Sequence, residues 1–181
     1  MTNAVHSLKF RLFTFIYILL LAHSAHGNSI YVEKSIFGRR EEVLIFKEQL
    51  KFKAKLDTGA KTSSLSATGI HEREINGKTW VYFNIMDPKS QKLLKKKFPL
   101  ERYAYIKQHR HGNHYAKHTK RPVIKLPLCL GTQVRDIEVN LVDRRHFLYP
   151  VLLGRDTIVQ FNGIVDPSKE YTTAPICEVN R

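Results

Sequence analysis

The sequence predicts an all-β domain that ends in one short helix, and three observations lead to this prediction. From Leu50 to Leu56, apolar residues alternate with lysines, which is the pattern of a strand with one buried face. Asn76-Gly77 stands between two strand-like runs and is the strongest short signal for a hairpin turn. Beyond Arg121, short apolar runs are separated by turn residues, a spacing that suits antiparallel strands.

The first residues have the order of a signal peptide. Two basic residues precede an apolar run over 12–22 that is too short to span a bilayer comfortably. Small residues at Ala25 and Gly27 then fit a cleavage site. We therefore expect a signal peptide over residues 1–27, one domain over residues 28–181, and export to the periplasm or the medium. An uncleaved membrane anchor is the alternative.

The chain is strongly basic. Its formal charge is +14 at pH 7, and loss of Lys9 and Arg11 with the first 27 residues would leave +12. An exported basic protein meets anionic lipid headgroups and acidic polymers more often than nucleic acid. We expect no specific nucleic-acid partner, and a weak association with an anionic membrane surface is compatible with the charge.

The strand over Leu50–Leu56 ends in Asp57-Thr58-Gly59-Ala60. A carboxylate at the close of a hydrophobic strand is poorly solvated unless it has partners. One interpretation is a turn aspartate whose side chain binds its own backbone, as Asp commonly does in turns. The other interpretation is a functional carboxylate.

Two motifs for bound groups fail in the next stretch. His71-Glu72 begins like a zinc-protease helix, but Ile75 occupies the place of the second histidine. Gly77-Lys78-Thr79 resembles the end of a phosphate-binding loop, but Glu72 stands where its first glycine is needed. The sequence therefore predicts no nucleotide and no zinc-protease centre here.

The segment from Asp87 to Arg121 is more polar and basic, and we predict an exposed excursion. Its histidines could ligate zinc, but their spacing matches no standard site, and the run 108–121 that holds them contains no cysteine or carboxylate. A solvated loop whose charge rises below roughly pH 6.5 is favoured, with no metal and no cofactor. These histidines are His109, His111, His114 and His118.

Strand patterns return over residues 122–130, 134–142 and 147–156, and the run 151–154 is apolar enough for burial on both faces. Asp156-Thr157 then offers an N-cap for a brief helix through about Phe161, which Gly163 and Asp166-Pro167 would end.

Both cysteines, Cys129 and Cys177, lie in the exported part of the chain, where an oxidising compartment permits a disulfide. Cys129 sits in the apolar run "LPLCL", so two buried free thiols are an equal alternative.

Two separated stretches together match one pattern, a strand that ends in "DTGA" and, much later, "VLLGRDTI". With these stretches the chain resembles the retropepsin-like aspartic proteases. More narrowly, "AKLDTGAKTSSLSA", "RPVIKLPL" and "LLGRD" resemble a group of small bacterial members often labelled ATP-dependent zinc proteases. The resemblance implies the closed β-barrel of the acid proteases.

The resemblance also implies roles for particular residues. Asp57 would be the catalytic residue, and the Thr58 hydroxyl would orient its loop. The other residues of the active-site loop would be Gly59 and Ala60, with Gly154, Arg155 and Asp156 supporting the loop from behind. Lys61 replaces an acidic residue of the retroviral relatives, so Arg155 needs another partner, such as Asp156 or Asp166, or lies exposed.

Aspartic proteolysis requires two carboxylates close enough to share one proton. The chain has a single Asp-Thr-Gly, so the second carboxylate would be Asp57 of another copy in a homodimer acting on a peptide or protein. Because a fold does not determine a function, a non-catalytic exported barrel is the alternative. It would bind a peptide, an acidic envelope polymer or a partner protein. A metalloprotein that uses the histidine run is the third reading.

Overall fold

The computed structural model describes residues 33–107 and 118–177. The chain divides into two units, Met1–Glu33 and Lys34–Arg181, and the fold below is that of the second unit. Its first elements are β1 (Ser35–Gly38), β2 (Arg40–Ile45), β3 (Leu50–Asp57), β4 (Ser63–Ser66), β5 (Thr68–Ile75), β6 (Lys78–Met86) and β7 (Leu93–Pro99). They are followed by β8 (Arg102–Lys107), β9 (His118–Leu130), β10 (Gln133–Val142), β11 (Val151–Gly154), α2 (Arg155–Gln160) and β12 (Gly163–Asp166). No helix in these described ranges is long and apolar enough to cross a membrane.

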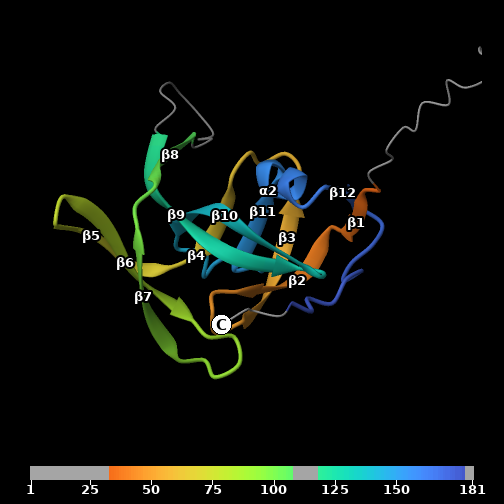
Figure 1. Ribbon diagram of the computed structural model, residues 1–181, viewed down its shortest axis with the longest axis horizontal. Coiled ribbons are helices and arrows are strands. Elements are labelled where there is room, and N and C mark those ends of the chain that lie inside the picture. Colours follow the sequence, from red (N-terminus) through yellow and green to blue (C-terminus); the bar gives the residue numbers. More distant parts are fainter. Residues whose placement is uncertain (1–32, 108–117, 178–181) are drawn as a thin grey trace, which may run out of the picture. The chain divides into compact units, whose positions relative to one another are not determined.

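A closed barrel forms the centre of the fold (Figure 1). Strands pair in the order β10-β4-β11-β3-β2-β9-β8, and β10 also pairs with β9, so six of these strands close into a ring. The pairs β11–β3 and β10–β4 are parallel, whereas β2–β3, β9–β10 and β8–β9 are antiparallel. The predicted all-β class and closed barrel are confirmed.

Alternation along β3 directs one face of the strand into this barrel. Phe52, Ala54 and Leu56 are buried, while the intervening lysines are exposed. The strand predicted over Leu50–Leu56 is therefore confirmed. β2 alternates in the same way, and the buried residues of all the barrel strands form one hydrophobic core, in which burial of apolar surface is the main stabilising term.

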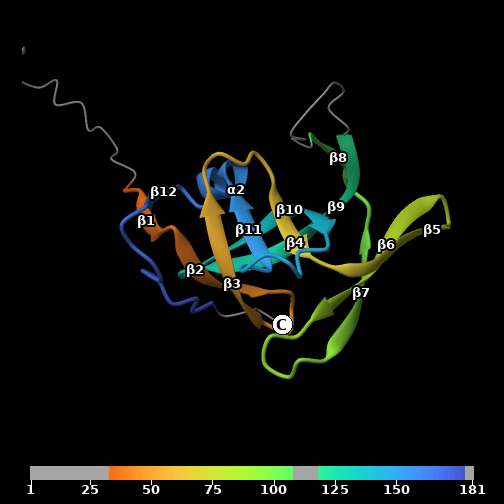
Figure 2. The same cartoon turned by 180° about the vertical axis from the view of Figure 1, so that it is seen from behind.

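A second, three-stranded sheet consists of β5, β6 and β7 (Figure 2). Asn76 and Gly77 form its first turn, with positive φ angles of 52° and 71°. The predicted hairpin is therefore confirmed. Alternate residues of β6 are buried and belong to the same core cluster as the barrel interior, namely Val81, Phe83 and Ile85.

The segment from Asp87 to Arg121 is largely exposed or half-buried where the structure describes it, as predicted, but it is not a loop throughout, because it contains β7, β8 and the start of β9. Lys95, Lys97 and Leu93 occupy the exposed positions of β7, while Leu94 and Phe98 pack against the core from the other face. The lysine-rich composition of β7 is that of a strand with one face in solvent, and it did not distinguish this strand from a loop. Residues 109, 111 and 114 of the histidine run lie outside the described residues, and His118 is the exposed first residue of β9.

The short helix is confirmed, but its start differs from the prediction. Gly154 is the N-cap of α2, and Asp156 lies in the first turn. Aspartate is favoured at the N-cap, and it is also favoured in the first turn, where its carboxylate interacts with the positive end of the helix dipole. The residue type alone therefore did not separate these two positions for Asp156. The residues after α2 form β12, which pairs in parallel with β1.

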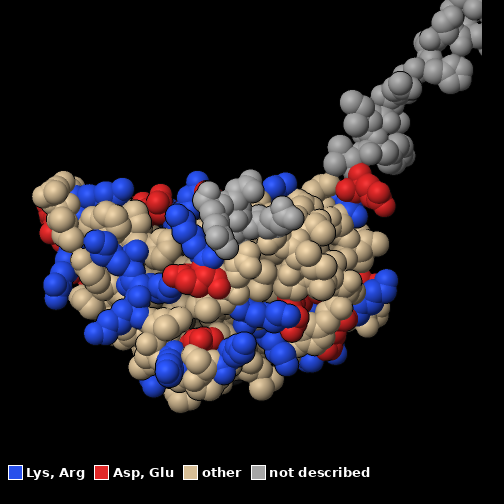
Figure 3. Space-filling view, turned by 60° about the horizontal axis from the view of Figure 1, so that its bottom comes forward, with Lys and Arg blue, Asp and Glu red and all other residues tan. Residues whose placement is uncertain are grey.

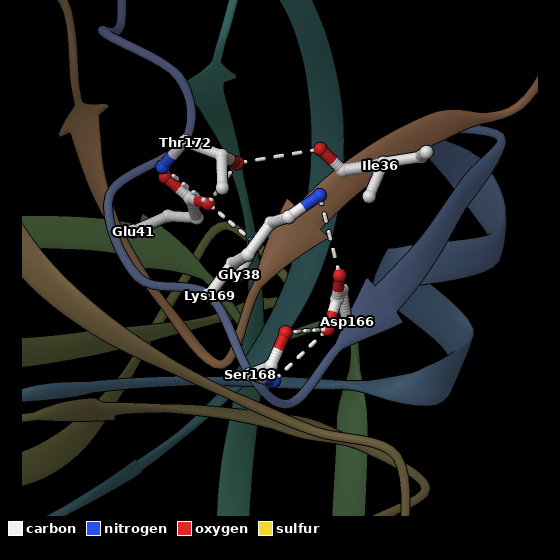
Figure 4. A network of polar contacts seen from close by, with 7 residues as sticks. All are labelled: Ile36, Gly38, Glu41, Asp166, Ser168, Lys169 and Thr172. Atoms are coloured by element: carbon white, nitrogen blue, oxygen red, sulfur yellow. Dashed lines mark hydrogen bonds and ion pairs between the residues drawn. The ribbon is translucent and has the colours of Figure 1, made fainter.

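The C-terminal segment is held by a buried carboxylate and a disulfide. Glu41 is fully buried and accepts hydrogen bonds from the backbone amides of Gly38 and Thr172 at 2.6 and 3.0 Å (Figure 4). Cys129 and Cys177 form a disulfide, which decides between the two alternatives left open by the sequence. These contacts tie the chain after β12 to β2 and β9.

Candidate active site

Asp57 and Gly154 meet at one end of the barrel, where their strands finish. They are the last residues of β3 and β11, and the parallel pairing of these strands places them opposite each other. Parallel strands finish at the same end of a sheet, so the turn after Asp57 lies beside the start of α2 (Figure 2). The two stretches that match one sequence pattern are thus brought together in space.

The Asp57 carboxylate is held by its own turn. Its Oδ1 accepts hydrogen bonds from the amides of Gly59 at 3.1 Å and Ala60 at 3.3 Å. Its Oδ2 lies 3.5 Å from the Lys55 ammonium, and 31% of the side chain is exposed. These contacts are those expected of a turn aspartate, and part of the side chain remains accessible to solvent.

The start of α2 supports this turn from behind. The amide of Arg155 donates to the carbonyl of Ala60 at 2.8 Å, and the amide of Asp156 donates to the carbonyl of Lys61 at 3.2 Å. A Cβ on Gly154 would lie only 2.7 Å from the backbone carbon of Thr62. The contact therefore requires glycine at this position. Backbone hydrogen bonds hold the turn against the start of α2.

Three buried polar residues complete the support, and of these the sequence had singled out only Thr157, as part of a helix cap. The Ser63 hydroxyl accepts a hydrogen bond from the Gly154 amide at 3.0 Å and lies 2.7 Å from the Thr157 hydroxyl. The Asn140 amide donates to the Ser63 carbonyl at 2.6 Å. No local pattern marks Ser63 or Asn140 for this role, because their partners are distant in the chain.

Two residues of the pattern, Thr58 and Arg155, lie at the surface. Thr58 is exposed, and no hydrogen bond of its hydroxyl is found within residues 33–107 and 118–177. Arg155 is also exposed, and its Nη1 lies 3.5 Å from the Gly59 carbonyl. Asp166 instead contacts Ser168 and Lys169, so it is not the partner of Arg155.

Asp57 opens into a pocket of about 600 Å³. The pocket is lined by Arg39, Arg40, Lys55, Asp57, Arg144, His146, Phe147, Leu148, Tyr149 and Leu152. One carboxylate therefore stands among four side chains that are cationic at neutral pH. Phe147 and Leu148 are exposed by 61% and 89%, so the rim of the pocket is apolar.

Arg144 differs from the other cations of the pocket because it is buried. Its Nε donates to the Tyr149 carbonyl at 3.2 Å and its Nη1 to the Ser64 hydroxyl at 3.0 Å. Burial lowers the pKa of Arg144, repulsion from Arg121 lowers it further, and attraction to Asp57 opposes both effects.

The positive charge of Arg144 is the least neutralised in the pocket. Arg39 and Arg40 share the carboxylate of Glu170, and Lys55 lies near Asp57. Within the described part of the chain, no carboxylate forms an ion pair with Arg144. A buried cation without an anionic partner favours the binding of an anion.

No group of three or more metal-ligating side chains is found among the residues that the structure describes. Most of the histidine run lies outside those residues, so this finding concerns the barrel and the three-stranded sheet only.

Comparison with known proteins shows relatives for most of this unit. A probable alpha-L-glutamate ligase of Desulfotalea psychrophila is 32% identical over 118 residues, which cover 64% of this chain and 24% of that protein. A protein of the same description from Shewanella pealeana is 29% identical over 120 residues, covering 66% and 25%. The chain thus spans about a quarter of the length of these curated relatives.

A solved structure and a family model match more of the chain. The crystal structure of a Legionella pneumophila protein of unknown function superimposes with a TM-score of 0.65 at 37% identity, covering 78% of this chain and all of that one. The family model described as retropepsin-like aspartic endopeptidase RimB matches residues 36–175, which include both Asp57 and Gly154. The chain therefore belongs to the RimB-like family of retropepsin-like aspartic endopeptidases.

Proposed function

We propose that the protein is an aspartic endopeptidase that works as a homodimer. The main support is the position of Asp57, which is held at the end of β3 by a turn, is backed by the Gly154 contact and opens into the pocket. Among the described residues, no second Asp-Thr-Gly turn faces Asp57. A two-fold axis that brings Asp57 of a second copy opposite the first would supply the missing carboxylate.

The chemistry follows from two carboxylates that share one proton. The ionised carboxylate takes a proton from a bound water, and the oxygen of that water attacks the carbonyl carbon of the peptide bond. The protonated carboxyl donates to the carbonyl oxygen, which gives a tetrahedral diol. Transfer of a proton to the amide nitrogen then breaks the C–N bond and releases an amine and a carboxylic acid. The Asp57 side chain is partly exposed, so a water molecule and a second carboxyl group can approach it.

The charges of the pocket support an acidic peptide as substrate. Arg144 presents a buried cation without a carboxylate partner in the described chain, whereas the exposed Lys55 and Arg39 lie beside Asp57 and Glu170. Side-chain carboxylates of a substrate would complement these groups. The curated relatives are themselves named for a ligase of α-L-glutamate, an acidic amino acid, which agrees with this choice.

The test is cleavage of matched acidic and neutral peptides across pH by the wild type and Asp57→Asn. We expect a bell-shaped rate profile on the acidic side of neutrality. We also expect a loss of roughly 10²–10⁴-fold in kcat for Asp57→Asn, the usual size of an acid–base contribution. Asp136→Asn makes the same chemical change at an exposed position of β10 and should keep full activity.

Sedimentation at several protein concentrations accompanies the kinetics. The wild type should dimerise over the concentrations at which it cleaves, and added salt should weaken cleavage of acidic peptides more than of neutral ones. A wild type that stays monomeric, with Asp57→Asn cleaving equally well, would exclude this proposal.

The alternative is a non-catalytic exported barrel that binds a peptide, an acidic envelope polymer or a partner protein. The observation in its favour is that Oδ1 of Asp57 is already satisfied by two amides of its own turn. Under this alternative, acidic peptides would bind without being cleaved, and Asp57→Asn would leave their affinity unchanged.

A further inference from the structure

The three-stranded sheet has an outer face that points away from the hydrophobic core. Along β6, Val81, Phe83 and Ile85 are buried, so Trp80 and Tyr82 lie on the opposite side. The register of the sheet places Arg73 of β5 opposite Trp80, and Lys97 of β7 opposite Tyr82. We call this side of β5, β6 and β7 the outer face.

The charge of the outer face is entirely positive among the described residues. Its cations are Arg73, Lys78, Lys95 and Lys97. The two acids of β5, Glu72 and Glu74, pair with Val81 and Thr79 and therefore point to the other side. Lys and Arg side chains gather over the part of the surface that these strands form (Figure 3). The outer face is thus complementary to an anionic partner.

The ring faces of the two aromatic residues are already in contact with cations or with an imidazole. The Lys97 ammonium lies 4.5 Å from the centre of the Trp80 ring, and the Lys78 ammonium lies 5.6 Å from it. Tyr82 stacks on His71 with ring centres 5.3 Å apart. Single-stranded nucleic acids bind aromatic side chains through base stacking, which needs open ring faces. The arrangement therefore favours an anionic surface over a stacked base.

Exposed apolar side chains stand at both ends of the outer face. Met86 and Leu93 pair across β6 and β7 and are exposed by 44% and 58%. At the other end, Ile75 is exposed by 38% beside Lys78. Apolar side chains flanking a belt of aromatic and basic residues are the composition of surfaces that lie in a membrane interface.

We propose that the outer face docks on a bilayer that contains anionic phospholipids. Lys95 and Arg73 line a hollow of about 350 Å³ on the same sheet, whose lining contains no acidic residue and which can receive a phosphate headgroup. The lysines contact headgroup phosphates through their ammonium groups, while their aliphatic stems and the aromatic rings lie at headgroup depth. Leu93 and Met86 enter the boundary between headgroups and acyl chains.

Trp80 gives a direct measurement because it is the single tryptophan of the chain. The full chain is titrated with vesicles of phosphatidylcholine, and with vesicles of phosphatidylcholine mixed with phosphatidylglycerol. We expect Trp80 emission to shift to shorter wavelength with the mixed vesicles only, because the indole moves from water into the interface. Absence of this shift would overturn the proposal, as would a response to single-stranded RNA that exceeds the response to vesicles.

Charge-reversal variants show whether vesicle binding depends on the outer face or only on the net positive charge of the chain. Lys95→Glu combined with Lys97→Glu should lower the vesicle partition coefficient by roughly 30-fold or more, since each basic residue near an anionic surface contributes about 1 kcal/mol. Lys107→Glu combined with Lys125→Glu makes the same net-charge change on exposed positions of β8 and β9. Equal losses in both double variants would overturn the proposal. The N-terminal apolar segment is the same in every variant and cannot produce a difference between them.

A variant without a charge change tests how much the exposed apolar side chains contribute to membrane binding. Leu93→Asn leaves the charge unchanged and alters an exposed side chain that does not belong to the core. It should weaken the binding that persists at high salt. If Leu93→Asn leaves this salt-resistant binding intact, the proposed insertion of the outer face is wrong.

Discussion

Gly154 lies directly opposite Asp57 where β11 and β3 leave the barrel in parallel, and it touches the backbone of the loop that carries the aspartate. A side chain at Gly154 would separate the two halves of the site. The geometry of the loop that carries Asp57 therefore depends on a residue of another strand.

Gly154→Ala should therefore destabilise the fold and impair the site together. The added Cβ would lie within 2.8 Å of the backbone of Lys61 and Thr62, which must move. Overpacking of this kind costs about 1–3 kcal/mol. Chemical denaturation measures the change, with the exposed α2 variant Val159→Ala as a control that should shift stability by less than about 0.5 kcal/mol. Wild-type stability in Gly154→Ala would show that the loop is not packed as described.

The buried pair Ser63 and Thr157 should show strong energetic coupling. Ser63→Ala removes the acceptor of the Gly154 amide and the partner of the Thr157 hydroxyl, so it leaves buried polar groups unsatisfied. We expect a loss of about 1–3 kcal/mol from Ser63→Ala. In a double-mutant cycle with Thr157→Val, the second substitution should cost less once the first is present. Strictly additive changes would argue against the hydrogen bond between the two hydroxyls.

Asp143 should remain ionised in strongly acidic solution. Hydrogen bonds from the Arg145 guanidinium, and then from its backbone amide, lower the pKa of Asp143 to about 2. Because the folded-state pKa is lowered, the stabilisation is complete above the unfolded value of about 3.9 and is lost as the pH falls through about 2. The loop over 143–150, which contributes Arg144 to the pocket, therefore keeps this contact in the acidic range where cleavage is expected.

Carboxyl NMR titration of Asp143 measures this directly. In Arg145→Ala the midpoint should return toward the ordinary aspartate value, while the titration of Asp87, whose pKa is lowered mainly by Ser90, should not change. A wild-type midpoint near 4 would contradict the ion pair.

Export and trimming of the chain remain a prediction, and we propose that the mature protein begins near Asn28. The order of basic, apolar and small residues over 1–27 is that of a signal peptide, and the disulfide between Cys129 and Cys177 suits an oxidising compartment. N-terminal mass spectrometry of protein from the native host is the measurement. A mature pool that retains Met1 would mean an anchor or no export.

Local patterns allowed much of the fold to be predicted. The alternation over Leu50–Leu56, the Asn76-Gly77 turn and the apolar run over 151–154 each identified a strand or a hairpin correctly. The pairing of "DTGA" with "VLLGRD" further pointed to the family that the comparisons show. These features depend on backbone periodicity and turn geometry, which neighbouring residues determine.

The arrangement around Asp57 required the tertiary structure. The barrel closes through β9–β10 and β10–β4, and this closure brings Asn140 and Ser63 against the loop that carries Asp57. It also buries Arg144 at the pocket wall, where the sequence shows only one more basic residue in a basic chain. The lysine-rich strand β7 was missed for a related reason, because its apolar face is recognised as a core face only once β6 lies beside it. Period and turn type are encoded locally, whereas the partner of each strand depends on which apolar faces cover one another in the folded chain.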